Sequence, residues 1–228
     1  MGTTITFATS AGEATGYLAA PLAGSGVPVI VIQEWWGLIP QIERTCDRLA
    51  EAGFMALAPD LYEGAKVPLT EPDEAAKAMM GLELRRAAAE LSGAVDELVR
   101  RSGHAKVGVM GFCMGGGLAL VLGTTRADAV GATVACYGVH PWAELHPDLD
   151  QLSGPVQIHC ADLDDFFTPA AADEMAARLE GLGKVVSLYH YEDADHAFFN
   201  EDRTEVYRAD DAELLFDRST AFLRSSLS

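Results

Sequence analysis

The segment from Lys106 to Gly123 constrains the fold of this chain more than any other stretch. It reads K-V-G-V-M-G-F-C-M-G-G-G-L-A-L-V-L-G, which predicts a short buried strand, one sharp turn and an apolar helix in immediate succession. Gly111 and Gly115 stand two residues before and two residues after Cys113. A turn this tight has no room for a Cβ atom at those two positions. The segment therefore predicts a strand-to-helix junction with Cys113 at its apex.

The residues from Gly111 to Gly115 have the spacing of a G-x-S-x-G nucleophile elbow, in which the central side chain is exposed above a sheet. Here the hydroxyl of that motif is replaced by the thiol of Cys113. A helix N-terminus and a histidine within reach make a thiolate accessible at neutral pH. The alternative is that Cys113 is a small buried residue in a glycine-rich junction. The strand before it and the helix after it favour a nucleophile.

Strands and helices are predicted to alternate along the whole chain. The predicted strands cover 3–9, 16–21, 28–33, 54–58, the residues before Cys113, 129–136, 156–160 and 184–191. The predicted helices cover 39–52, 74–80, 84–98, the segment after Cys113, and regions around 172–179 and 212–222. The first two strands should form an antiparallel hairpin at one edge. The alternation predicts an α/β fold with a mostly parallel, doubly wound sheet, and any ligand should lie at the carboxyl ends of the strands.

The composition limits the partners and the domain count. With 228 residues, 49% of them hydrophobic, we expect one domain, 1–228, with one core. A net charge of -18 disfavours nucleic acid and anionic membrane surfaces as partners. The N-terminus M-G-T-T-I-T has neither a basic nor an apolar leader region. We expect a cytoplasmic monomer that acts on a small molecule.

The four cysteines do not indicate disulfides or a metal site. Cys46, Cys113, Cys136 and Cys160 are far apart and show no C-x-x-C spacing. A second hypothesis assigns a metal to the cluster His190, Glu192, Asp193, Asp195 and His196. No H-E-x-x-H or comparable ligand spacing supports it. We therefore expect no metal and no cofactor.

An activated nucleophile needs a base within reach and an acid that orients the base. In an α/β-hydrolase sheet the acid and then the histidine follow the nucleophile, each in a loop after a strand. His196 has this position, after the last predicted strand. For the acid, Asp162 is nearest to the end of its strand, whereas Asp165 lies deeper in the loop. Their order in the chain does not separate them.

Glu34 follows a continuous buried strand and precedes Trp35 and Trp36. A carboxylate at the end of a buried strand is costly unless it is paired or protonated. Glu34 is therefore expected to serve either the function or a specific salt bridge.

These motifs resemble those of the dienelactone hydrolase family of α/β-hydrolases, which carry a Cys-Asp-His triad. The resemblance spans nearly the whole chain and is carried by Gln33–Gly37, Pro59–Tyr62, Gly111–Gly116, Asp165–Pro169 and His196–Phe198. In the family the catalytic acid precedes a short aromatic-to-proline run, which implies Asp165. The resemblance also implies that Glu34 helps to generate the thiolate, and that the backbone N–H groups of Trp35 and Met114 form the oxyanion hole. Trp36 and Phe198, in the matching motifs, are expected to line the substrate site.

The chain also departs from the family pattern. The family clamps a substrate carboxylate with two arginines, but Asn200 stands where one of them is expected, and the region of the other offers only Lys77. Arg203 is close in sequence to His196 and could substitute. The expected function is hydrolysis of ester or lactone bonds through Cys113 and an acyl-enzyme intermediate, with neutral substrates processed at least as well as anionic ones. The alternative is a catalytically silent hydrolase fold that binds or senses a small ligand.

Overall fold

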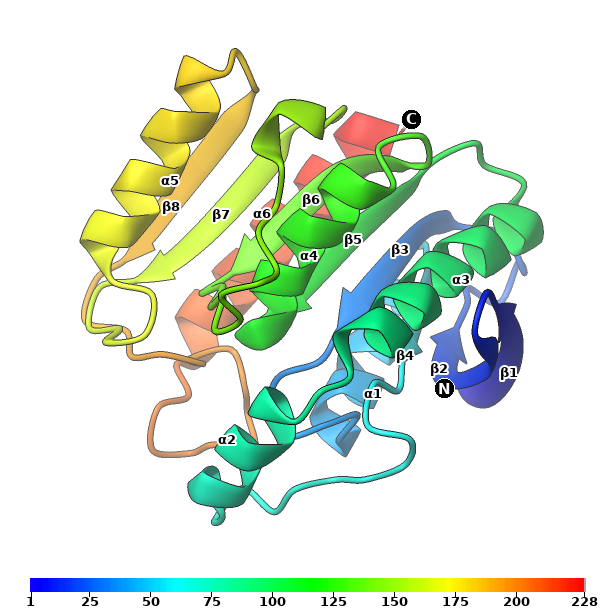
Figure 1. The fold of residues 1–228 in the computed structure, drawn as a ribbon, viewed down its shortest axis with the longest axis horizontal. Helices are drawn as coiled ribbons and strands as arrows, with labels where there is room; N and C mark the ends of the chain where they lie inside the picture. The colour runs from blue at the N-terminus through cyan, green and yellow to red at the C-terminus, as the bar shows by residue number, and fades with distance from the viewer. Residues whose placement is uncertain (228) are drawn as a thin grey trace.

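Eight strands form one sheet, in the order β1-β2-β4-β3-β5-β6-β7-β8, in the computed structural model, which describes residues 1–227 (Figure 1). The strands are β1 (Thr3–Thr9), β2 (Gly12–Ala19), β3 (Val27–Ile32), β4 (Phe54–Pro59), β5 (Val107–Phe112), β6 (Val130–Cys136), β7 (Val156–Ala161) and β8 (Val186–Tyr191). Strands β3 to β8 run parallel, and only the pairings of β2 with β1 and with β4 are antiparallel. The predicted edge hairpin and mostly parallel sheet are confirmed.

Helices cover both faces of this sheet (Figure 1). α1 (Pro40–Glu51) and α6 (Ala209–Leu227) pack on one face, where they share a hydrophobic cluster. α3 (Leu84–Ser102), α4 (Met114–Thr125) and α5 (Pro169–Gly181) pack on the other face. The short helix α2 (Pro72–Met80) lies in the long connection after β4, and a 3-10 turn, η1 (Leu149–Gln151), precedes β7. This arrangement is the doubly wound α/β fold expected from the alternation of elements.

The central strands are buried on both sides, which explains their continuous apolar runs. Every residue of β4, β5, β6 and β7 is buried, whereas most residues of the edge strand β8 are only partly covered. Helix α4 is buried along nearly its whole length, and its apolar residues therefore occur all around the helix. The carboxyl ends of β3, β5, β7 and β8 consequently meet at one rim, where the connecting loops carry the polar residues.

Some boundaries differ from the prediction. Strand β2 begins at Gly12 instead of residue 16, because the hairpin turn is tight and pairs Thr9 directly with Gly12. Gly12 has a φ of 128°, a conformation that favours glycine. Strand β8 begins at Val186, two residues later than expected. Among residues 1–227 there is no helix with both the length and the apolar character needed to cross a membrane.

Candidate active site

The junction between β5 and α4 has the geometry of a nucleophile elbow. Cys113 adopts φ 55° and ψ −122°, a strained backbone conformation for a residue with a side chain. A Cβ atom on Gly111 would lie 1.9 Å from the carbonyl oxygen of Gly115, and one on Gly115 would lie 2.4 Å from that of Ile32. Both contacts are impossible, so the two glycines are required by the turn as predicted. Cys113 is thereby placed at the N-terminus of α4.

The loops after β7 and β8 bring an aspartate and a histidine together at the same rim. The Nδ1 atom of His196 lies 2.7 Å from Oδ2 of Asp164, whose side chain is fully buried. The other carboxylate oxygen, Oδ1, accepts hydrogen bonds from the backbone N–H groups of Phe166 and Phe167 at 2.8 and 2.9 Å. Asp164 is thus the residue that orients His196.

The expectation that Asp165 orients His196 is therefore wrong in this structure. The hydrogen bonds from Phe166 and Phe167 to Asp164 fold the loop back, so that the carboxylate of Asp164 faces His196. Asp165, the next residue, lines the cavity in front of Cys113. The other candidate, Asp162, pairs instead with His190 at 2.9 Å.

The His196 side chain is only 13% exposed and lies among aromatic rings, with Phe166 at 5.0 Å and Tyr137 at 5.1 Å between ring centroids. Burial alone lowers the pKa of His196. The negative charge of the Cys113 thiolate and the hydrogen bonds to Asp164 and Cys113 outweigh burial and raise that pKa to about 10. The site therefore favours an imidazolium at position 196.

Glu34 is buried next to this pair, at the carboxyl end of β3. Its Oε1 atom accepts a hydrogen bond from the Tyr137 hydroxyl at 3.3 Å, and its Oε2 atom accepts one from Nδ2 of Asn200 at 2.9 Å. Burial raises the pKa of Glu34, and the hydrogen bonds from Asn200 and Tyr137 offset only part of that rise. Glu34 is thus a buried acid held by two neutral donors rather than by a salt bridge.

Two backbone N–H groups next to this cluster are free. Trp35 lies in the turn after β3, and Met114 is the first residue of α4. Within residues 1–227, neither backbone N–H donates a hydrogen bond. A helix N-terminus also carries a partial positive charge. Both groups are available to a ligand.

A cavity of about 670 Å³ opens over Cys113 and His196. Trp35, Trp36 and Arg203 line it, together with Asp165, Asp195 and Glu205. The guanidinium of Arg203 lies 5.9 Å from the centre of the Trp36 ring and is paired with Glu205 at 2.8 Å. The cavity therefore combines aromatic walls with one arginine whose charge is already compensated.

Three residues that were expected to bind substrate do not line this cavity. Lys77 is exposed on α2, where its ammonium group pairs with Glu74 at 2.6 Å. Phe198 is fully buried in the core, packed against Tyr137 and Tyr191. Asn200 is also fully buried and donates to Glu34, so it lies behind the cavity. All three residues were predicted to bind substrate because of their positions in the sequence relative to the site motifs, and the fold places their side chains elsewhere.

Two residues of the site, Tyr137 and His140, were not predicted from the sequence. Tyr137 follows β6 with a φ of 38° and donates to Glu34. His140 lines the cavity, and neither of its ring nitrogens has a partner among the described residues. Burial and the neighbouring His146 lower the pKa of His140, which favours its neutral form. The signal that could have found both is their place in the loop at the carboxyl end of a buried strand.

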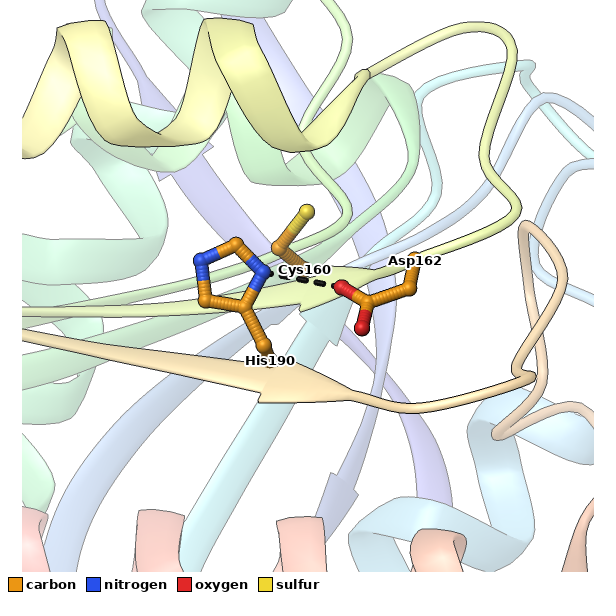
Figure 2. A group of neighbouring side chains, drawn as sticks. All are labelled: Cys160, Asp162 and His190. Atoms are coloured by element: carbon orange, nitrogen blue, oxygen red, sulfur yellow. Dashed lines mark hydrogen bonds and ion pairs between the residues drawn. The ribbon is translucent and has the colours of Figure 1, made fainter.

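Cys160, Asp162 and His190 form a second group with the same residue types as a triad (Figure 2). Cys160 lies inside β7 and is fully buried, without the sharp turn that presents Cys113. Burial and the nearby carboxylates raise the pKa of the Cys160 thiol to about 12, which disfavours a thiolate. This group does not have the properties of a nucleophilic site.

The sheet, the elbow and the His–Asp pair define an α/β-hydrolase. The sequence pattern of the dienelactone hydrolase family matches residues 14–227, so the chain belongs to that family. Its enzyme class is that of lactone and ester hydrolases.

Similar proteins cover the whole chain. It is 33% identical to protein usf of Aquifex pyrophilus, over 100% of both chains. It is 28% identical to a carboxymethylenebutenolidase of Pseudomonas putida, over 93% of this chain and 92% of the relative. The crystal structure of a putative dienelactone hydrolase from Klebsiella pneumoniae subsp. pneumoniae superimposes with a TM-score of 0.85 at 22% identity, over 98% of this chain and 99% of that chain. The expected fold class is confirmed.

Proposed function

We propose that the chain hydrolyses carboxylic ester or lactone bonds with Cys113 as nucleophile, His196 as proton carrier and Asp164 as the residue that positions His196. The observation that carries this proposal is the 2.7 Å hydrogen bond from His196 to Asp164, in a cavity that also contains the elbow residue Cys113. The relative from Pseudomonas putida is named a carboxymethylenebutenolidase, which supports a lactone as one substrate class.

In the acylation step the thiolate of Cys113 attacks the carbonyl carbon and forms a C–S bond. The electron pair of the C=O bond moves to the oxygen, which the free N–H groups of Trp35 and Met114 can stabilise. When the tetrahedral intermediate collapses, the C–O bond breaks and His196 gives its proton to the leaving alkoxide. With a lactone, the alcohol stays attached to the acyl group.

In the deacylation step water attacks the thioester. His196, now neutral, accepts the proton of that water, and Asp164 stabilises the resulting imidazolium through the 2.7 Å hydrogen bond. Collapse of the second intermediate expels the Cys113 thiolate and releases the carboxylic acid. The thiolate of Cys113 and the imidazolium of His196 are thereby restored.

Glu34 supports the charged state of this pair. The attraction between the carboxylate of Glu34 and the imidazolium of His196 favours the ionised form of both groups. Burial raises the pKa of Glu34 and so opposes its ionisation, which leaves its protonation sensitive to a bound substrate. We infer that an ionised Glu34 helps to generate the Cys113 thiolate by stabilising the imidazolium form of His196.

The charges around the cavity favour neutral substrates. The guanidinium of Arg203 is compensated by Glu205, and Asp165 and Asp195 add negative charge to the lining. A substrate carboxylate would meet net repulsion there, and the net charge of -18 would slow its approach. Neutral lactones and esters with aromatic or apolar groups fit the walls formed by Trp35 and Trp36.

The test is hydrolysis of nitrophenyl esters by the wild type and by Cys113→Ala, with Cys46→Ala as the matched control. We expect Cys113→Ala to lose turnover while its thermal transition stays nearly unchanged, and Cys46→Ala to keep turnover. Mass spectrometry after a short exposure to iodoacetamide should find the label on Cys113 first. Substantial turnover in Cys113→Ala would exclude the cysteine mechanism. A wild type without turnover on any ester or lactone would favour a ligand-binding role.

A further inference from the structure

A cluster of possible metal ligands lies at the sheet edge, away from the elbow. Cys160 on β7 and His190 on β8 are paired in the register of the two strands, so their side chains emerge on the same face of the sheet. Asp162 stands two residues after Cys160, so its side chain lies on the same face of the sheet as that of Cys160. Figure 2 shows the three side chains together, with the sulfur of Cys160 on the side of α5.

The distances in this cluster suit a shared cation. One ligand atom from each residue, namely Sγ, a carboxylate oxygen and a ring nitrogen, lies within 4.8 Å of the other two. Nδ1 of His190 is 2.9 Å from Oδ1 of Asp162, and Nε2 of the same ring is 3.2 Å from Oδ1 of Asp173. A neutral imidazole has only one N–H group and can donate to only one of these carboxylates. A proton or a metal ion must therefore occupy the other contact.

A protonated His190 would satisfy both aspartates, and the Sγ atom of Cys160 already contacts the backbone carbonyl oxygens of Ala161 and Phe167 at 3.5 and 3.8 Å. The geometry that favours a metal ion is the convergence of a third donor, Sγ of Cys160, on the same point as the histidine and aspartate atoms. Cysteine sulfur, histidine nitrogen and aspartate oxygen are together a ligand set for zinc. Asp173, in the first turns of α5, then accepts the Nε2–H group and fixes the tautomer in which Nδ1 binds the metal. The side chains of Asp162 and His190 are 34% and 36% exposed, so an ion can reach the cluster from solvent.

We propose that Cys160, Asp162 and His190 bind a zinc ion, with Asp173 as the positioning residue for His190 and water as the fourth ligand. Zn–S bonds of about 2.3 Å and Zn–N bonds of about 2.0 Å require the three side chains to close slightly around the ion. Binding displaces the proton of the Cys160 thiol, which leaves to solvent. The ion would join β7, β8 and the start of the loop that carries Asp164.

The sequence does not reveal such a site, because its ligands come from two strands. Asp162 follows Cys160 by two residues, but His190 lies 28 residues further along the chain. No linear zinc motif contains this spacing. Only the parallel pairing of β7 with β8 brings the three residues together.

The test uses the full chain with Cys113→Ala, so that the Cys113–His196 pair cannot supply a competing thiolate site. After treatment with a chelator, zinc binding is measured by calorimetry and cobalt binding by absorption. We expect one equivalent of zinc at neutral pH and a thiolate-to-cobalt charge-transfer band. Adding Cys160→Ala should remove the band, and His190→Gln should abolish stoichiometric binding. Asp173→Asn should weaken zinc binding about 10- to 100-fold, the usual effect of losing such a partner.

His104→Gln, a histidine outside the cluster, is the matched control and should change neither measurement. Circular dichroism checks that each variant is folded, and Asp162→Asn serves in place of His190→Gln if that variant is not. The proposal is overturned if the parent protein binds no stoichiometric zinc, or if binding and the band persist in both the Cys160 and the His190 variants. Catalysis plays no part in these measurements, so they are independent of the proposed hydrolytic mechanism.

Discussion

The carboxylate of Asp164 is fixed at both of its oxygens relative to His196. Oδ2 lies 2.7 Å from Nδ1 of His196, while Oδ1 accepts the backbone N–H groups of Phe166 and Phe167. The ring tautomer is thereby determined, because Nδ1 carries the hydrogen that Asp164 accepts. Nε2 is left as the nitrogen that can exchange a proton with Cys113.

Asp164→Asn should lower kcat by about 10⁴-fold, as the same change does in a serine protease triad. The asparagine oxygen can still accept from Phe166 and Phe167, so the loop should keep its shape, but the amide would favour the wrong tautomer of His196. Asp165→Asn is the matched control and should change kcat by only a few-fold, because Asp165 faces the cavity. Steady-state kinetics of the two variants on one ester decides between them. The assignment fails if Asp165→Asn is the more damaging change.

Glu34→Gln should lower kcat by about 10²-fold or more, the usual contribution of a group that takes part in proton transfer. The isosteric amide can still accept a hydrogen bond from Asn200, and the Tyr137 hydroxyl can rotate to accept one, so folding should be kept. Kinetics and thermal unfolding should be measured on the same preparation. Full activity with a lowered unfolding temperature would show that Glu34 is only a structural buried acid.

The elbow was predictable from the sequence because its constraints are local. The clashes that exclude a side chain at Gly111 and Gly115 arise within one turn and one neighbouring strand. The order of strands and helices was predictable for a similar reason, since each buried strand reads as an apolar run. His196 was identified from its place after the last strand.

The acid and the substrate residues were not predictable, because they depend on side-chain direction within loops. Asp164 and Asp165 are adjacent, and only the hydrogen bonds from Phe166 and Phe167 determine which one faces His196. Asn200 likewise follows the histidine motif, but its side chain turns inward to Glu34. An Asn200→Arg substitution would therefore place an arginine in the core and would not create an anion site.

Acid sensitivity of the fold should arise in part from His159. Its ring is fully buried and contacts the Tyr191 hydroxyl at 2.7 Å and Oε1 of Gln157 at 2.9 Å. Burial, together with the charge of Arg218, lowers the pKa of His159 from 6.5 to about 3. Between these values the unfolded chain binds a proton that the folded chain does not, so stability rises with pH and is lost as pH falls from about 6.5 toward 3.

The contribution of His159 to the free energy of unfolding changes by at most about 1.4 kcal/mol per pH unit. Urea unfolding at several pH values should show a shallower loss of stability in His159→Gln than in the wild type. His104→Gln should keep the slope of the wild type. An unchanged slope in His159→Gln would mean that other groups account for the acid sensitivity.

The pairing of Arg203 with Glu205 leads to a prediction about substrate choice. Arg203 is the arginine of the cavity, and its guanidinium is held by Glu205 at 2.8 Å. Wild-type kcat/KM should be at least as high for a neutral methyl ester as for the matched substrate that bears a free carboxylate.

Glu205→Gln removes the competing charge and frees Arg203 to donate to that carboxylate. Because the Glu205 side chain is 61% exposed, the gain should be only that of a solvent-screened ion pair, about two- to fivefold in kcat/KM for the acid. The neutral ester should be unaffected, and the double variant with Arg203→Gln should lose the gain. A wild type that prefers the acid tenfold or more, and loses this preference in Arg203→Gln, would show that Arg203 already binds anionic substrates in the presence of Glu205.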